Sequence, residues 1–160
     1  MDITACMCTC RSSSPLGCGS FENGVLSSEA FYDDKGLLEN YTYYDRNGEK
    51  YFEEKYKAGE LKMGYQFVRN NPKPIEVPVN NKAYVIKTLD GKVLVNGFFE
   101  KGKMNKEWIY YNKNGHIKTK QNIQNNVSNG IRQDYSTNGD LVAIYNNTNG
   151  AINGFYEGYS

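Results

Sequence analysis

The stretch NKEWIYYNKNGHI (residues 105–117) returns 24 residues later as NGIRQDYSTNGDL (residues 129–141), and NGFYEGY (residues 153–159) begins the same pattern a third time. Three residue types keep this step: tyrosine at Tyr111, Tyr135 and Tyr159, asparagine at Asn105, Asn129 and Asn153, and glycine at Gly91, Gly115 and Gly139. Several residue types that share one period indicate a tandem repeat. The repeating unit therefore decides the fold class.

Short runs of strand-forming residues fill the repeat, as in Val93-Leu94-Val95, and they are too short for helices. Asn-Gly occurs eight times between such runs, and this pair supplies the positive φ angles of two-residue hairpin turns. Gly24, Gly36 and Gly48 step by 12 residues, the length of one strand plus one turn. We therefore expect an all-β protein, an elongated, twisted antiparallel meander sheet built from tandem β-hairpin repeats of about 24 residues, with roughly ten strands in one sheet.

The alternation of side chains along a strand predicts two different faces of that sheet. Residues two apart share a face, so Ile131 lies with Tyr135, and Ile109 lies with Tyr111. We expect this face to carry a ladder of rings and aliphatic side chains. We expect the opposite face to lie in water, with Lys118, Lys120, Arg132 and Asp134 on it.

Composition divides the chain into four segments. Residues 1–20 hold all four cysteines and a serine-rich run, which predicts a flexible tail. Residues 21–68 and 83–160 are predicted to hold hairpin repeats. Residues 69–82 contain three of the four prolines, and because proline cannot donate to a central ladder, we expect a linker or an edge crossing there.

The cysteines Cys6, Cys8, Cys10 and Cys18 do not have the two separated pairs of a zinc ribbon or finger, so no metal site is expected. Ile3-Thr4-Ala5-Cys6 has the local pattern of a bacterial lipoprotein cleavage box. Such a box would lipidate Cys6 and place the protein at the cell envelope if a longer precursor existed. As given, the chain is expected in the cytoplasm, so the sequence leaves the localisation open.

The charge and the hydropathy exclude several classes of partner. The chain has 19 Lys and Arg residues against 18 Asp and Glu residues, and a net charge of +1 provides no field toward nucleic acid or an anionic membrane. The mean hydropathy is -0.71, and no run reaches the ~20 apolar residues of a membrane span. We therefore expect no nucleic-acid partner and no transmembrane segment.

Little in the sequence indicates catalysis or a cofactor. His116 is the only histidine, and Glu53 and Glu54 are adjacent, hence on opposite faces of a strand, which is poor geometry for an acid–base pair. Residues 97–104 approach a phosphate-binding loop but end in Met104 and precede no predicted helix. We expect a protein that is not an enzyme and binds no cofactor.

The units at residues 32–36, 44–48, 108–115 and 129–139 resemble MORN-variant repeats, a family that includes antitoxin-like bacterial proteins. The pattern is an Asn-Gly pair, an aromatic strand that ends in tyrosine, a polar turn closed by glycine, and a second strand. The resemblance covers about residues 21–159 and is weaker across 65–90. Two positions depart from it, since Lys106 replaces the glycine after Asn105 and Lys87 replaces the tyrosine before Gly91.

This resemblance implies a non-catalytic repeat scaffold that binds a protein partner, or assembles with itself, through an aromatic sheet face and open sheet edges. The residues predicted for binding are Trp108, Tyr110, Tyr111, Tyr135 and Tyr159. Two alternatives stay open. Residues 108–115 also resemble the repeat of choline- or glucan-binding surface modules, which use stacked aromatic rings, and the chain is also compatible with an antitoxin-like protein or a surface lipoprotein.

Overall fold

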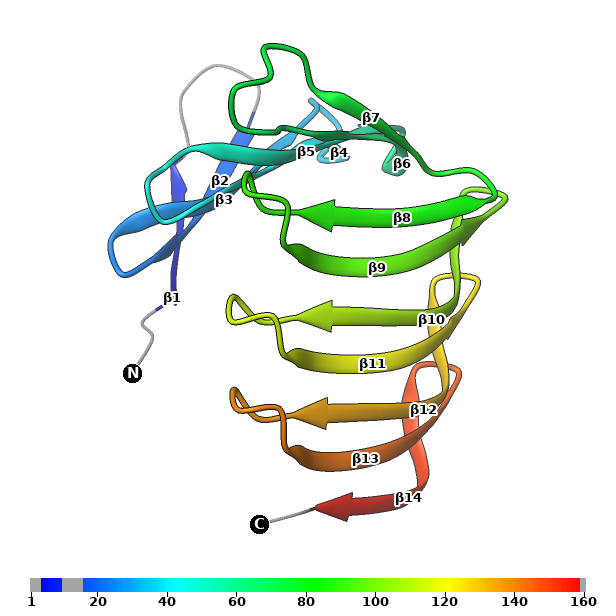
Figure 1. Cartoon of the computed structure of the whole chain (residues 1–160). Helices are drawn as coiled ribbons and strands as arrows, with labels where there is room; N and C mark the ends of the chain where they lie inside the picture. Colours follow the sequence, from blue (N-terminus) through cyan, green and yellow to red (C-terminus); the bar gives the residue numbers. More distant parts are fainter. Residues whose placement is uncertain (1–3, 10–15, 159–160) are drawn as a thin grey trace. The chain divides into compact units, whose positions relative to one another are not determined.

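The computed structural model describes the backbone of residues 4–9 and 16–158 and the side chains of residues 17–153. The described residues form no helix, and within each sheet every strand pairs antiparallel with the next strand along the chain (Figure 1). The predicted all-β antiparallel meander is confirmed. The described strands form two sheets of seven strands each, in place of the expected single sheet of roughly ten.

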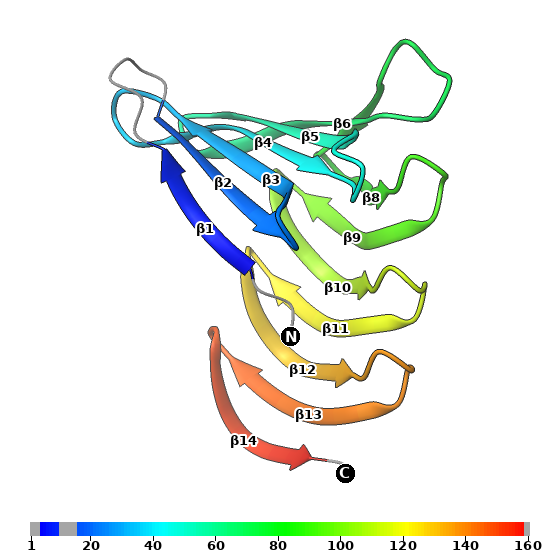
Figure 2. The same cartoon turned by 90° about the vertical axis from the view of Figure 1, so that its left-hand side faces the viewer.

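The first sheet contains β1 (Thr4–Thr9), β2 (Leu16–Glu22), β3 (Val25–Tyr32), β4 (Leu38–Tyr44), β5 (Lys50–Lys57), β6 (Glu60–Gln66) and β7 (Ile75–Pro78). The second contains β8 (Lys82–Lys87), β9 (Val93–Glu100), β10 (Lys103–Tyr111), β11 (Ile117–Gln124), β12 (Val127–Tyr135), β13 (Leu141–Thr148) and β14 (Ala151–Gly158). In each sheet the spatial order of the strands is their order in sequence (Figure 2).

The chain divides into two compact units. Unit 1 holds the first sheet together with Thr88–Gly91, and unit 2 begins at Val79–Lys87 and resumes at Lys92. Within the segment 69–82, β7 forms one edge of the first sheet and ends in Pro78. In the segment 1–20, for which the sequence predicts a flexible tail, the described residues include β1 at Thr4–Thr9 and the start of β2 at Leu16. The backbone edge of β3 supplies hydrogen-bonding partners to β2, and β2 supplies them to β1.

Unit 2 uses two kinds of hairpin connection in strict alternation. Two-residue turns join β9 to β10, β11 to β12 and β13 to β14; in the last, Asn149 and Gly150 have φ angles of 50° and 84°. Positive φ angles at both central residues are those of a type I′ turn, whose backbone twist matches the twist of the flanking strands. The other connections are five-residue loops whose fourth residue is a glycine with positive φ, such as Gly115. One repeat of 24 residues therefore contains one connection of each kind.

Four of the five-residue loops share a local hydrogen-bond pattern. In the loop after β10, the Asn112 Oδ1 atom accepts hydrogen bonds from the backbone N–H groups of Asn114 and His116, at 3.0 and 3.1 Å. The first residue of the loop does the same in three others, through the side chains of Asp33, Asp45 and Ser136. Because Asp, Asn and Ser side chains bind backbone groups two residues on, they specify this loop without any tertiary contact.

Three of the eight Asn-Gly pairs are not turns. Asn96-Gly97, Asn129-Gly130 and Asn153-Gly154 lie inside β9, β12 and β14. At Asn129-Gly130, β12 contains two more residues than the paired segment of β11, and the φ angle of Gly130 is 101°. The pair forms a bulge there, so the asparagine period seen in the sequence marks a kink within a strand rather than its end.

The core of unit 2 lies on the face opposite to the one expected. Paired residues share a face, and Trp108, Gln121 and Arg132 are paired in register across β10, β11 and β12. Trp108 is only 3% exposed, whereas Ile131, on the other face, is 55% exposed. Arg132 and Asp134 therefore lie on the buried face, while Lys118 and Lys120 lie with Ile131. Because 24 is an even number, both faces repeat with the same period, and the period alone does not identify the buried face.

The core of unit 1 mixes aromatic and charged side chains. Phe52 is fully buried, and Glu53 and Glu54 beside it are 9% and 7% exposed on opposite faces of β5. Glu53 forms ion pairs with Lys50 and Lys55. Burial of these carboxylates is compatible with folding because each has hydrogen-bond donors, as buried charges require.

Candidate binding site on the second sheet

The predicted binding residues occupy different environments. Trp108 is buried in unit 2, while Tyr110, Tyr111 and Tyr135 are partly exposed. Burial raises the pKa of the Tyr110 hydroxyl. Tyr159 lies outside the described residues. The structure therefore does not gather these five side chains into one exposed aromatic site.

Trp108 is the centre of an aromatic cluster. Its ring centroid lies 5.3 Å from that of Phe99 and 6.0 Å from that of Tyr84, and Phe99 and Tyr84 are themselves 4.9 Å apart. The edge-to-face arrangement of Phe99 against both partners is favourable for aromatic rings. A ring buried in this way does not present a face on which a sugar or choline group stacks.

The position of Trp108 and three further positions of its repeat change character one repeat later. Moving 24 residues along the chain replaces Trp108 by Arg132 and Ile123 by Asn147. The same step replaces Met104 by Ser128 and Tyr110 by Asp134. Four apolar or aromatic side chains of one repeat therefore correspond to four polar side chains in the next. These polar positions mark a candidate site that the predicted aromatic ladder does not include.

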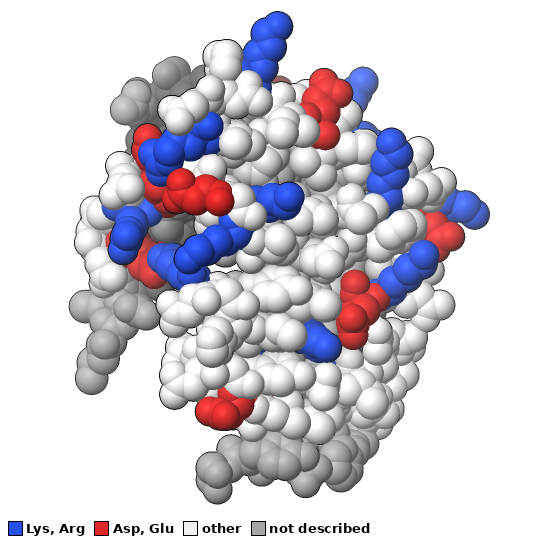
Figure 3. All heavy atoms as spheres, in the orientation of Figure 1, with Lys and Arg blue, Asp and Glu red and all other residues white. Residues whose placement is uncertain are grey.

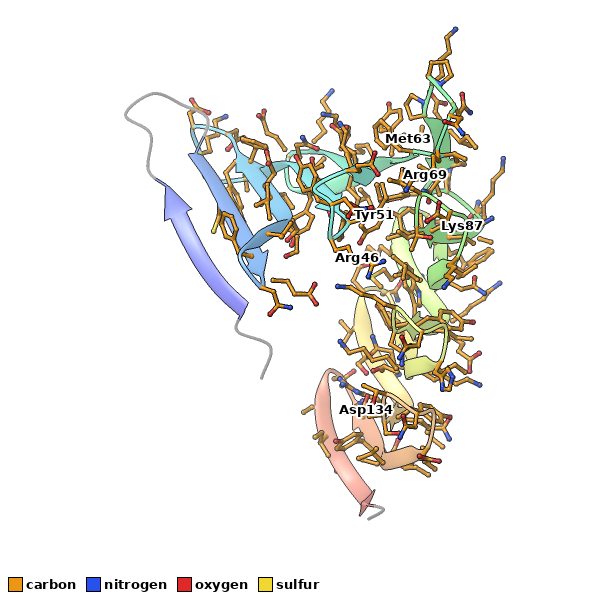
Figure 4. All side chains as sticks on the ribbon, turned by 60° about the vertical axis from the view of Figure 1, so that its left-hand side comes forward. Arg46, Tyr51, Met63, Arg69, Lys87 and Asp134 are labelled. Carbon is orange, nitrogen blue, oxygen red and sulfur yellow. The ribbon has the colours of Figure 1, made fainter. Side chains whose placement is uncertain are left out.

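A pocket of about 330 Å³ opens at these polar positions. We call it the β12–β14 pocket, and it is lined by Ser128, Arg132 and Asp134 of β12, Tyr145 and Asn147 of β13, Gly150 of the turn, and Ile152 of β14 (Figure 4, where Asp134 is labelled). All seven residues belong to unit 2. Smaller side chains at core positions leave space that the preceding repeat fills with rings.

An arginine is held in place at the pocket. The Arg132 Nε atom donates to both oxygens of Asp134, at 3.1 and 3.2 Å, and the Thr119 hydroxyl donates to Asp134 Oδ1 at 2.9 Å. The guanidinium carbon of Arg132 lies 5.8 Å from the centre of the Tyr145 ring. Within the described part of the chain, the two terminal nitrogens of Arg132 have no hydrogen-bond partner, and the side chain is 42% exposed.

A buried amide also lines the pocket. Asn147 is 6% exposed, and its Nδ2 atom donates to Ser128 Oγ at 3.0 Å. Because the Ser128 oxygen accepts this bond, the hydroxyl proton is available to donate elsewhere. The pocket therefore combines hydrogen-bond donors, an aromatic ring and the aliphatic side chain of Ile152, a combination typical of small ligand sites.

A second polar cluster lies in unit 1, on the face of Phe52. Tyr43 and Tyr56 donate hydrogen bonds to Glu54 Oε2, at 3.1 and 2.8 Å, and Ser28 shares a hydrogen bond with the Tyr41 hydroxyl at 3.0 Å. Burial, followed by the charge of Glu54, raises the pKa of both Tyr43 and Tyr56 well above the ordinary value. Because these groups satisfy one another, the cluster is a means of burying a carboxylate.

Charges on the face shown in Figure 3 are mixed, with Lys and Arg side chains among Asp and Glu side chains. Among residues 17–153, no group of three or more His, Cys, Asp or Glu side chains is placed to hold a metal ion. No helix in the described residues is long and apolar enough to cross a membrane.

Comparison with known proteins adds no assignment. No family model matches the chain, and no curated protein matches it.

Proposed function

We propose that this protein is a non-catalytic scaffold of β-hairpin repeats that binds a protein partner, or a second copy of itself, by adding a strand to the edge of β14. The observation that carries the proposal is that β14, eight residues long, pairs with β13 on one side and with none of the described residues on the other. An unpaired strand presents a row of N–H and C=O groups to which an extended segment can add.

Comparison of the sheet edges supports the choice of β14. The edge strand β7 has only four residues and includes Pro78, and the edge strand β8 carries Lys82 and Lys87 at its ends. Short length, proline and lysine are features by which proteins protect edges from pairing. The sequence of β14, AINGFYEG, contains neither proline nor lysine. This edge therefore lacks the features that oppose strand addition. The edge strand β1 also lacks proline and lysine, but it has six residues against the eight of β14.

Proline substitutions at two successive positions test the proposal. Tyr156 and Glu157 pair with Tyr145 and Ile144 in the β13–β14 ladder. Because successive N–H groups of a strand point to opposite sides, one of Tyr156→Pro and Glu157→Pro removes a bond to β13, and the other removes only an outward donor. Circular dichroism and the Tm identify the outward variant as the one that retains its stability.

Association is then measured for the wild-type chain and both variants. Analytical ultracentrifugation detects self-association, and affinity capture followed by a binding titration of the recovered partner detects a heterologous complex. We expect the outward proline variant to weaken binding at least tenfold while it keeps its Tm. Unchanged association of that stable variant, or a wild-type chain that neither self-associates nor captures a partner, contradicts the proposal.

A further inference from the structure

We propose that the β12–β14 pocket binds a carboxylate group through Arg132 and Ser128, and that this carboxylate is an aspartate or glutamate side chain of the polypeptide that adds to β14. The assignment of the carboxylate depends on the pocket alone. The identity of the molecule that carries the carboxylate rests on the proposed function. Because β14 contributes Ile152 to the pocket wall, a polypeptide that adds to β14 lies next to the pocket.

The repeat provides the first argument, since it shows what these positions contain when they serve only as core. One unit earlier, Trp108 and Ile123 are 3% and 7% exposed. Arg132 and Asn147 take their places in unit 2 and surround a pocket of about 330 Å³. Exchange of a buried indole for a guanidinium loses apolar packing. An arginine at a core position, with a side chain that is 42% exposed and terminal nitrogens that bond none of the described residues, favours a ligand-binding role over a packing role.

The geometry of the arginine provides the second argument. The Nε atom of Arg132 bonds both Asp134 oxygens, and Asp134 is in turn held by Thr119. This fixes the plane of the guanidinium and leaves its terminal nitrogens, which form a planar fork that fits a carboxylate. A side chain already held in one conformation loses less entropy on binding.

The rest of the pocket suits a carboxylate on a short aliphatic chain. Ser128 accepts a hydrogen bond from Asn147, which leaves its hydroxyl proton as a second donor in the pocket that Arg132 also lines. Tyr145 and Ile152 add apolar surface, and Ile152 is 63% exposed. The one or two methylene groups of an aspartate or glutamate side chain can pack against this surface.

The charge of Asp134 opposes the ligand and yields a diagnostic prediction. Asp134 already compensates the charge of Arg132, so a free carboxylate binds weakly. Asp134→Asn keeps an oxygen that accepts from Arg132 Nε and removes the negative charge. We expect this variant to bind carboxylates several-fold more tightly, whereas a pocket that serves only to solubilise the end of the sheet predicts no such gain.

Binding is measured by two-dimensional NMR titration of the full chain. The free carboxylate probe is glutarate, and the polypeptide probes are acetyl-Thr-Val-Glu-Val-Thr-amide and the same peptide with glutamine in place of glutamate. We expect the glutamate peptide to shift the side-chain amide signals of Asn147 and to bind at least tenfold more tightly than the glutamine peptide. Arg132→Gln lowers its affinity about tenfold or more, and Arg132→Lys gives an intermediate loss because lysine lacks the fork.

Two control variants separate the site from the fold. Lys120→Gln removes a positive charge from the opposite face of the same sheet and leaves binding unchanged. The double variant Arg132→Trp, Asn147→Ile restores the residue types of the preceding repeat and abolishes binding, while its circular dichroism spectrum stays that of the wild type.

The outcomes distinguish this inference from the proposed function. Equal affinity for the glutamate and glutamine peptides together with no response to glutarate, or unchanged affinity in Arg132→Gln, overturns the carboxylate site. Binding of glutarate without preference for the glutamate peptide overturns the polypeptide source. The outward proline variant of β14 should lose the peptide and keep glutarate, so failure of strand addition leaves the pocket result intact.

Discussion

A Cβ atom on Gly97 would lie 2.3 Å from Cδ2 of Trp108, because the indole of β10 lies directly on the backbone of β9. The φ angle of Gly97 is not in the positive region, so glycine is required there by space and not by conformation. The closeness of this contact allows Trp108 to reach Phe99 and Tyr84, and it couples β8, β9 and β10 into one packed cluster.

Substitution of Gly97 by alanine should therefore be strongly destabilising. The added methyl group must displace a buried ring, and we expect a loss of about 3 kcal/mol in the free energy of unfolding. Urea unfolding followed by the fluorescence of Trp108, the single tryptophan, measures it directly in unit 2. Asn96→Ala, one residue earlier and exposed, should change the free energy by less than about 0.5 kcal/mol. Equal losses of unfolding free energy in Gly97→Ala and Asn96→Ala would show that the close packing of Trp108 on Gly97 does not contribute to stability.

The variant Lys106→Gly should be more stable to unfolding than the variant Lys106→Ala. Its φ angle is 67°, a left-handed conformation that costs a residue with a side chain about 1–2 kcal/mol, and the next repeat has Gly130 in its place. Both Lys106→Gly and Lys106→Ala remove the amine that lies 3.8 Å from the centre of the Phe98 ring. The difference between the free energies of unfolding of the two variants therefore reports the cost of the positive φ angle alone. We expect urea unfolding to show that Lys106→Gly is more stable than Lys106→Ala by about 1 kcal/mol. Preference for alanine, the usual order inside strands, would refute the prediction.

Removal of one hydroxyl donor from Glu54 should destabilise unit 1. Tyr43→Phe and Tyr56→Phe each leave a buried carboxylate with one hydrogen bond fewer, and bonds to charged groups contribute about 1.5–3 kcal/mol. Tyr65→Phe is a matched control on the other face of the sheet and should cost less than about 0.5 kcal/mol. Thermal unfolding monitored by circular dichroism provides the comparison. A loss in Tyr65→Phe as large as in the other two would point to ring packing and not to Glu54.

Stability should fall at alkaline pH. Burial raises the pKa of Tyr51 to about 12, while an unfolded tyrosine has a pKa of about 10. A raised folded-state pKa contributes stability that is fully present below pH ~10 and is lost as the pH rises toward 12. We expect the free energy of unfolding to be flat from pH 8 to 9 and to decrease above pH ~10, with a shallower decrease in Tyr51→Phe. Identical slopes for the wild type and Tyr51→Phe above that pH would contradict this assignment.

Much of the fold follows from local patterns that the sequence displays. The 24-residue step of Asn, Tyr and Gly predicts the hairpin repeat, and Asp33, Asp45 and Asn112 specify their loops through hydrogen bonds within five residues. Asn-Gly, by contrast, predicts a turn at each of its eight occurrences, and three of these pairs lie inside strands. The pair at Asn129-Gly130 forms a bulge because the partner strand continues past it, and that depends on pairing and not on the dipeptide.

The candidate site was visible only in part. Arg132 and Asp134 were predicted to lie in water on the solvent face, yet they line a pocket on the face that buries Trp108. The sequence does contain a signal, since alignment of the repeats sets Arg132 against Trp108 and Asn147 against Ile123. That signal has meaning only once Trp108 is known to be buried.

The sequence by itself determined the all-β class, the hairpin unit and its loops, because these depend on backbone preferences and on hydrogen bonds between near neighbours. Only the tertiary structure decided the division into two sheets, the buried face, and the position of the β12–β14 pocket. Strand alternation with an even repeat makes the two faces equivalent in period, and the choice between them comes from rings such as Trp108, Phe99 and Tyr84 packing across strands. Which face is buried therefore depends on contacts between neighbouring strands of the sheet, and the sequence of a single repeat does not determine it.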